Sequence, residues 1–151
     1  MLRKFGIIAV LALMVTAFAA VPALAVTNFN NAPPGAHYAQ GSGEPVCTLS
    51  GLTVTCTGTA IEGVGNTNAT VNLSVTSTFT GTCTNPGGHL VEPFTESETA
   101  TTATAVSSAE FLATFGCPNP NWTPEVTGTA ISFLYTLTFA GFTEPAITVI
   151  G

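Results

Sequence analysis

Apolar and polar side chains alternate with a period of two along most of the chain after Pro45, which is the pattern of β-strands that bury one face. The segment 69–83 has apolar residues at alternate positions and Thr, Ser or Asn between them. It predicts one long strand, or two strands in line that are broken near Ser77. The alternation is strongest over residues 131–139, which predict another half-buried strand.

Three further segments complete the predicted set of strands. The polar, Thr-rich segment 91–106 is typical of an edge strand, the segment 111–117 alternates through Phe111, Phe115 and Cys117, and a last strand is expected near 146–150. About seven short strands separated by turns, with no helical periodicity, predict an all-β fold. We expect an antiparallel β-sandwich, and a closed β-barrel is the alternative.

The segment 46–56 predicts a β-hairpin with a defined register. Gly51 and Leu52 form a two-residue loop of type II′, which requires glycine at its first central position. Cys47 and Cys56 then face each other in a non-hydrogen-bonded pair, whose Cα atoms are about 4.5 Å apart. This separation allows a disulfide between them.

The four cysteines are therefore expected to be fully paired. With Cys47 bonded to Cys56, Cys83 and Cys117 remain for a second disulfide at one end of the sandwich. A zinc site is disfavoured because the four positions contain no Cys-x-x-Cys spacing. Two disulfides in one small domain indicate an oxidising compartment.

Residues 1–25 have the form of a secretory signal peptide. Arg3 and Lys4 precede an apolar run over residues 5–21, and the small residues Ala23-Leu24-Ala25 predict cleavage before Val26. The protein is therefore expected to be secreted, to the extracellular space or to a periplasm, with no membrane anchor in the mature chain. The alternative is that the apolar run remains as an uncleaved membrane anchor.

The mature chain is expected to have two parts. Residues 26–44 are rich in Asn, Pro and Gly and predict an irregular N-terminal lead-in without strands, and residues 45–151 form the β-sandwich domain. Within that domain, Asn85-Pro86-Gly87-Gly88 predicts a type II turn with Gly87 at the third position.

Charge limits the partners of this chain. Its eight acidic residues are all Glu, and its two cations both lie in the leader, so the formal net charge of −6 becomes −6 − 2 = −8 in the mature protein. Binding to a polyanion depends on Lys and Arg, which displace its counterions. Nucleic acid and acidic membrane surfaces are therefore excluded as partners.

Two cysteine motifs resemble a known pattern. Cys83-Thr84-Asn85-Pro86-Gly87-Gly88 and Cys117-Pro118-Asn119-Pro120-Asn121-Trp122-Thr123 are similar to motifs of small secreted bacterial β proteins to which no activity is assigned. The resemblance covers roughly residues 80–127. It implies a bacterial origin and a compact β fold.

Glu92, Glu96 and Glu98 are the first candidates for a ligand site. Glu96 and Glu98 are two residues apart and therefore share one face of a strand. Paired carboxylates can hydrolyse glycosidic bonds or hold Ca²⁺. A solvated edge strand protected by charge explains the same residues and is the favoured interpretation.

His89 and Trp122 are the other candidates. His89 precedes Glu92 by three residues, and such a pair can supply two ligands or a general base with its orienting acid, although a loop histidine is commonly only solvated. An exposed Trp122 can stack on a sugar ring. The favoured interpretation is that Trp122 covers the Cys83–Cys117 disulfide at the end of the sandwich.

No Gly-x-Ser-x-Gly nucleophile motif occurs, and all four thiols are used in disulfides. We therefore predict no catalytic residue, no metal and no cofactor. The expected function is that of a secreted, non-enzymatic binding or surface-associated module, with a glycan or another cell-surface molecule as the candidate partner. The alternatives are a carbohydrate-binding module that uses exposed aromatic rings and a Glu-based hydrolase.

Overall fold

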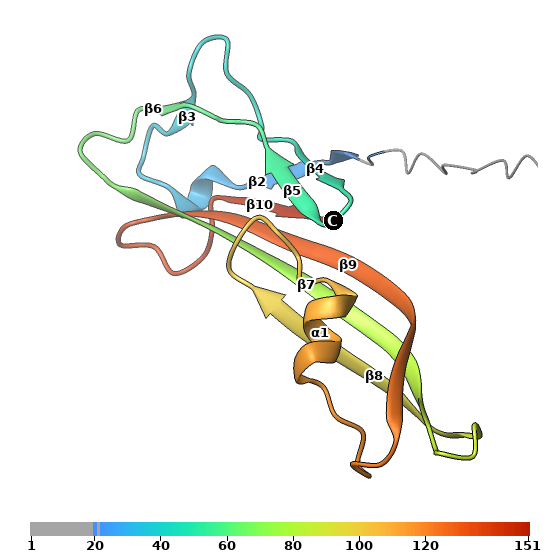
Figure 1. The fold of residues 1–151 in the computed structure, drawn as a ribbon. Coiled ribbons are helices and arrows are strands. Elements are labelled where there is room, and N and C mark those ends of the chain that lie inside the picture. Colours follow the sequence, from blue (N-terminus) through green and yellow to red (C-terminus); the bar gives the residue numbers. More distant parts are fainter. Residues whose placement is uncertain (1–19, 21) are drawn as a thin grey trace, which may run out of the picture.

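The structure, a computed structural model, describes residue 20 and residues 22–151. Residues 1–19 and 21, which include most of the predicted signal peptide, lie outside the described residues. The described chain is an elongated, all-β, sandwich-like fold of antiparallel sheets with one short α-helix (Figure 1). The predicted fold class is confirmed.

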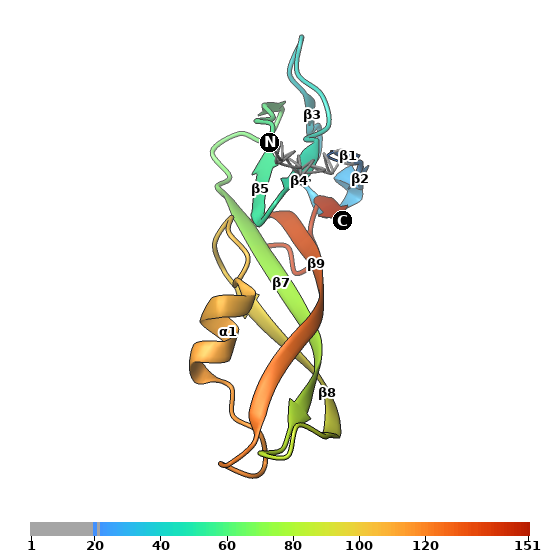
Figure 2. The same cartoon turned by 45° about the vertical axis from the view of Figure 1, so that its right-hand side comes forward.

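A five-stranded antiparallel sheet runs through the whole molecule, with the strand order β2-β10-β9-β7-β8. Its strands are β2 (Ala25–Thr27), β10 (Ile147–Ile150), β9 (Thr123–Phe139), β7 (Ala69–Thr84) and β8 (Leu90–Ala100). The long strands β7 and β9 twist around each other along the length of the molecule (Figure 2). β2 and β8 are the outer strands, so the sheet is open. β8 is an edge strand as expected, but it ends at Ala100 and does not continue to Val106.

Smaller elements cover this sheet at both ends (Figure 1). A three-stranded sheet has the order β1-β4-β5, and a two-stranded sheet pairs β3 with β6. Their bounds are β1 (Pro22–Ala23), β4 (Cys47–Ser50), β5 (Thr53–Cys56), β3 (His37–Tyr38) and β6 (Ile61–Glu62). A 3₁₀-helix, η1 (Phe29–Asn31), follows β2 in the sequence and lies at the same end of the molecule as these small sheets. The helix α1 (Ser108–Thr114) covers the five-stranded sheet towards its other end.

The predicted alternation along β7 and β9 is confirmed, because the apolar parity of each strand faces the core. The buried side chains are Val75, Phe79 and Cys83 on β7 and Phe133, Tyr135, Leu137 and Phe139 on β9. Ser77 does not break β7. It is fully buried on the same face, and its Oγ donates a 2.8 Å hydrogen bond to the carbonyl of Val106, which satisfies the polar group.

The core has two packed regions on one face of the five-stranded sheet. The main cluster joins β9 and β10 to the hairpin β4–β5 and contains Phe133, Val149 and Val54. Under α1, Phe79 of β7 stacks on Phe111 with ring centroids 4.3 Å apart. Because Val75 and Phe79 share a parity on β7, the small sheets and α1 cover the same face.

The hairpin and both disulfides are confirmed. Cys47 lies opposite Cys56 in the predicted register, with Cα atoms 4.0 Å apart. Gly51 has a positive φ of 59°, which a type II′ turn requires at its first central position. Leu52, at the second central position, has a negative φ, as this turn type also requires. Cys83 and Cys117 form the second bridge, with a Cα–Cα distance of 6.1 Å.

The expectation of a strand at 111–117 and of no helix is wrong. Residues 108–114 form α1, which Ser107 caps: its Oγ accepts a hydrogen bond from the amide of Glu110, and the Glu110 carboxylate accepts one from the amide of Ser107. This capping box fixes the start of the helix. The alternation through Phe111 and Phe115 also fits a helix, because residues four apart lie on one helical face.

Replacing Ser107 by alanine is expected to lower the free energy of unfolding by about 1 kcal/mol. Hydrogen bonds from the backbone and the side chain of Ser107 hold the pKa of Glu110 below its usual value. The carboxylate therefore contributes to stability above its usual pKa range, and this contribution is lost as the pH falls through the lowered pKa. In Ser107→Ala, an NMR pH titration should show the Glu110 pKa closer to its usual value. The control Ser108→Ala should leave the titration unchanged.

Two further local expectations are corrected. In the turn after β7, Gly88 rather than Gly87 has a positive φ, of 78°, so the turn is not type II. Asn85 organises it instead, because its Oδ1 accepts hydrogen bonds from the amides of Gly87 and His89. Residues 26–44 contain η1, β3 and most of β2, and these short elements are held by tertiary contacts that a local pattern does not reveal.

Candidate functional site

An open hollow of about 690 Å³ lies between the hairpin β4–β5 and strand β9. We call it the apolar groove. The apolar side chains that line it are Pro22, Ala23, Leu49, Leu52, Ile131, Phe133 and Ile150. They come from the two sheets and from the segment that joins them, so the groove exists only because the small sheet stands over the large one.

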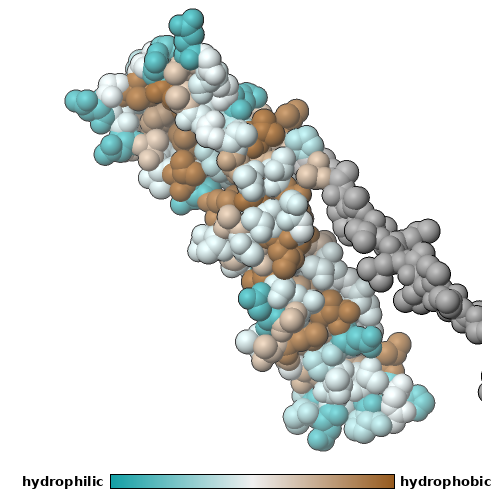
Figure 3. Space-filling model, turned by 45° about the horizontal axis from the view of Figure 1, so that its top comes forward, coloured by the Kyte–Doolittle hydropathy of each residue, from teal (hydrophilic) through white to brown (hydrophobic). Residues whose placement is uncertain are grey.

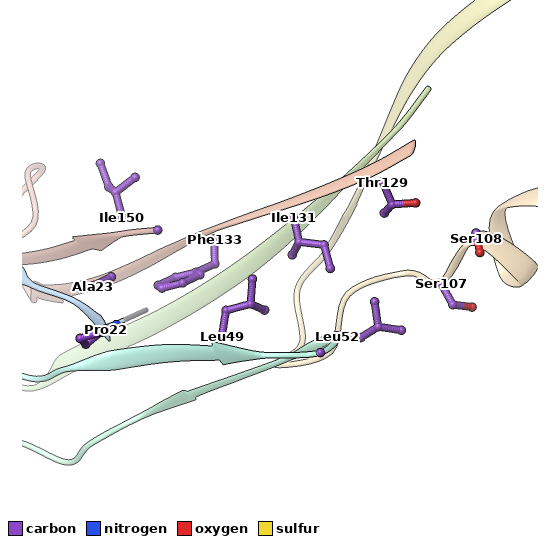
Figure 4. A pocket seen from close by; sticks show the side chains of 12 residues that line it. Pro22, Ala23, Leu49, Leu52, Ser107, Ser108, Thr129, Ile131, Phe133 and Ile150 are labelled. Atoms are coloured by element: carbon purple, nitrogen blue, oxygen red, sulfur yellow. The ribbon is translucent and has the colours of Figure 1, made fainter. Parts of the chain in front are cut away.

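The side chains of the two sheets face each other across the groove (Figure 4). Leu49 on β4 and Leu52 in the hairpin loop point towards β9, from which Ile131 and Phe133 point back (Figure 4). Ile150 points away from this space and is 70% exposed, so it forms a rim. The groove is therefore walled by leucines on one side and by isoleucine and phenylalanine on the other.

One end of the groove depends on the close approach of Gly151 to Phe133. The backbone of Gly151 pairs with Phe133 through two hydrogen bonds, of 2.7 and 3.2 Å. A Cβ at position 151 would lie 2.4 Å from the Phe133 ring and 3.1 Å from the Cβ of Ala23. Because position 151 is glycine, the Phe133 ring and Ala23 can both lie next to it and line this end of the groove.

The other end of the groove carries hydroxyl groups. Ser107, Ser108 and Thr129 line it, and the Ser107 hydroxyl donates a 2.7 Å hydrogen bond to Glu110. None of the twelve described lining residues has a charged side chain. The groove can therefore accept an uncharged apolar group and offer a few hydroxyls at one end, which is the usual composition of a ligand pocket.

Figure 3 shows one face of the molecule, on which several hydrophobic patches are separated by residues of intermediate hydropathy. The most hydrophilic residues on this face are most frequent at the two ends of the molecule (Figure 3).

The three candidate glutamates lie away from the groove, on the edge strand β8. Glu92, Glu96 and Glu98 pair with Cys83, Phe79 and Ser77 of β7, so all three project from the face that α1 covers. Glu92 and Glu96 line a second hollow of about 400 Å³, together with Phe94 and Phe115, and Glu98 does not line it. The Phe94 and Phe115 rings are 4.5 Å apart and fill the space between the edge strand and the chain after α1.

The histidines are exposed. His89 lies in the loop before β8, and no ion pair joins it to Glu92 among the described residues. His37 lies at the opposite end of the molecule, where its Nε2 is 3.8 Å from the Glu62 carboxylate, and both side chains are more than half exposed. An exposed pair of this kind contributes little to stability.

Trp122 is half-buried in the loop between Cys117 and β9. Its amide donates a 3.0 Å hydrogen bond to the carbonyl of Asn119. Trp122 takes part in none of the described aromatic ring pairs and does not line the apolar groove. The covering of the disulfide by Trp122 stays a prediction.

A second set of contacts ties the lead-in to the sheets. The Thr27 hydroxyl donates to the Glu44 carboxylate at 2.9 Å, so Tyr38 OH is the donor in its 2.5 Å contact with Thr27. Burial raises the pKa of Tyr38 above its usual value, and burial also raises the pKa of Tyr135. Both phenols therefore stay neutral at physiological pH, and the Tyr38 hydroxyl donates its hydrogen bond to Thr27.

The sequence did not point to the residues of the groove. Leu49 belongs to the predicted apolar face of the hairpin and Phe133 to that of β9, so both fit an ordinary core. The signal that was present is the hydrophobic Leu52 at a hairpin tip, where polar residues are usual.

Comparison with known proteins assigns no relative to this chain: no family model, no curated protein and no solved structure matches it. Within residues 20 and 22–151, no group of three or more His, Cys, Asp or Glu residues is placed so that it could hold a metal ion. No helix in the described part of the chain is long and apolar enough to cross a membrane.

Proposed function

We propose that this protein is a secreted, non-enzymatic binding module and that the apolar groove holds its ligand. The observation that carries the proposal is the open hollow of about 690 Å³ between the hairpin and β9, whose described lining side chains carry no charge. Its volume is within the range of about 300–1,000 Å³ that is usual for ligand pockets. The groove favours a ligand that presents an uncharged apolar group, and a glycan or cell-surface molecule fits only through such a group.

Several features support secretion and a non-enzymatic role. The two disulfides suit an oxidising compartment, and residues 1–25 have the pattern of a leader. The described side chains that line the groove include hydroxyls, but no His, Glu or free thiol that would act as a base or nucleophile. Nucleic acid is not proposed as a partner, because the only Lys and Arg lie in the leader.

The proposal predicts saturable binding of a neutral apolar dye, N-phenyl-1-naphthylamine, whose fluorescence rises when it leaves water. Leu52→Glu places a carboxylate at the mouth of the groove and should weaken dye binding at least about tenfold, because an apolar ligand cannot satisfy a buried charge. Leu52 is 36% exposed in a loop, so the variant should fold normally.

Leu90→Glu is the matched control, since Leu90 is 70% exposed at the start of β8 and outside the groove. It should bind the dye like the wild type, and circular dichroism should give all three proteins the same unfolding midpoint. The proposal fails if the folded wild type does not bind the dye, or if the two variants bind it equally well.

A further inference from the structure

The segment 22–27 is part of the folded domain and connects its two main sheets. In β1, Pro22 pairs with Thr48 and Ala23 with Cys47, at the outer edge of the small sheet. In β2, residues 25–27 pair with β10 at the edge of the large sheet. Ala23 and Ala25 pack against the main core cluster.

A cut between Ala25 and Val26, which the sequence pattern predicts, would divide β2. It would remove β1 and expose the edge of β4 at Cys47 and Thr48. It would also remove Pro22 and Ala23 from the groove and leave part of the core cluster uncovered. Exposed sheet edges and uncovered apolar surface both favour aggregation.

An earlier cleavage site would keep this segment. Ala17-Phe18-Ala19 has the same Ala-x-Ala form as Ala23-Leu24-Ala25. With a cut after Ala19, the apolar region covers residues 5–15, which is eleven residues and within the usual range of about 7–15.

We propose that a signal peptidase hydrolyses the Ala19–Ala20 bond, so that the mature protein begins at Ala20 and retains β1 and all of β2. Water adds across the peptide bond, Ala19 leaves with the new carboxylate, and Ala20 keeps the new amino group. The inference rests on the secretion in the proposed function and is independent of ligand binding at the groove.

The test is to secrete the full chain from a bacterial host with its own leader and to determine the N-terminus by intact mass and N-terminal sequencing. The wild type should begin at Ala20. Two matched variants each place a larger side chain before one candidate bond. Ala19→Val should accumulate precursor or shift the cut downstream, whereas Ala25→Val should still begin at Ala20.

A chain whose leader is joined directly to Val26 supplies a second measurement. Without residues 20–25, its secreted product should have a lower denaturant midpoint than the wild type, because β1 and Ala25 are missing. A wild-type product that begins at Val26, or a shortened product as stable as the wild type, would overturn the inference. If no processed protein is secreted at all, both the proposed cleavage site and the proposal that the protein is secreted fail.

Discussion

Replacing Phe79 by alanine is expected to lower the free energy of unfolding by about 3–5 kcal/mol. Phe79 is fully buried, and its ring stacks on that of Phe111 at a centroid distance of 4.3 Å and an interplanar angle of 17°. Removing the ring takes away its apolar burial and leaves a cavity between β7 and α1. Urea denaturation followed by circular dichroism measures the loss.

Val71→Ala on the same strand is the matched control, because Val71 is 53% exposed and should change stability by less than about 0.5 kcal/mol. If Phe79→Ala does not fold, Phe79→Leu still tests the site. It keeps much of the side-chain volume and should therefore be destabilised less than the alanine variant. If Phe79→Ala or Phe79→Leu lowers the free energy of unfolding no more than Val71→Ala does, the result would contradict the packing of Phe79 against α1.

Removing the Cys83–Cys117 disulfide by double alanine substitution is expected to cost about 3.5–4 kcal/mol, and removing Cys47–Cys56 about 2.5–3 kcal/mol. The bridges span 34 and 9 positions of sequence, so the first restricts the unfolded chain more than the second. One cysteine of each pair, Cys83 and Cys47, is fully buried or nearly so, and the loss of packing should therefore be similar in the two variants.

The fluorescence of Trp122 separates the two variants further. The Cys83–Cys117 bridge anchors the start of the loop that carries this half-buried ring, and its loss should expose the ring and shift its emission to longer wavelength. The Cys47–Cys56 variant serves as the control and should keep the native emission. A less stable hairpin variant would contradict the chain-entropy argument, and unchanged emission after loss of Cys83–Cys117 would mean that the bridge does not hold Trp122 in place.

The sequence was most informative where structure depends on local chemistry. The hairpin β4–β5 follows from one glycine at a turn and from alternation on both sides of it, so its register and the Cys47–Cys56 bridge were predictable. The buried faces of β7 and β9 were predictable for the same reason. The helix α1 was missed because a short segment with apolar residues at alternate positions also places Phe111 and Phe115 one helical turn apart. The Ser107–Glu110 capping box was the signal that distinguished the two interpretations.

The groove and the role of residues 22–27 were not predictable in this way. Whether Leu49 and Phe133 fill a core or line an open space depends on how far the small sheet stands from β9, and no local pattern contains that distance. Likewise, Ala23 and Ala25 have the composition of a cleavage site, and only their pairing with β4 and β10 shows that they also suit strands.

The long pairing of β7 with β9 determines when this chain is able to fold. Ala69 pairs with Phe139, seventy positions later, and even the nearest partners, Thr84 and Thr123, are separated by the whole of β8 and α1. During synthesis β7 therefore has only β8 as a sheet partner until β9 (Thr123–Phe139) has been made, and such distant pairing forms slowly. We expect the nascent chain to stay largely unstructured for most of its synthesis, the condition in which a polypeptide is threaded through a narrow export channel.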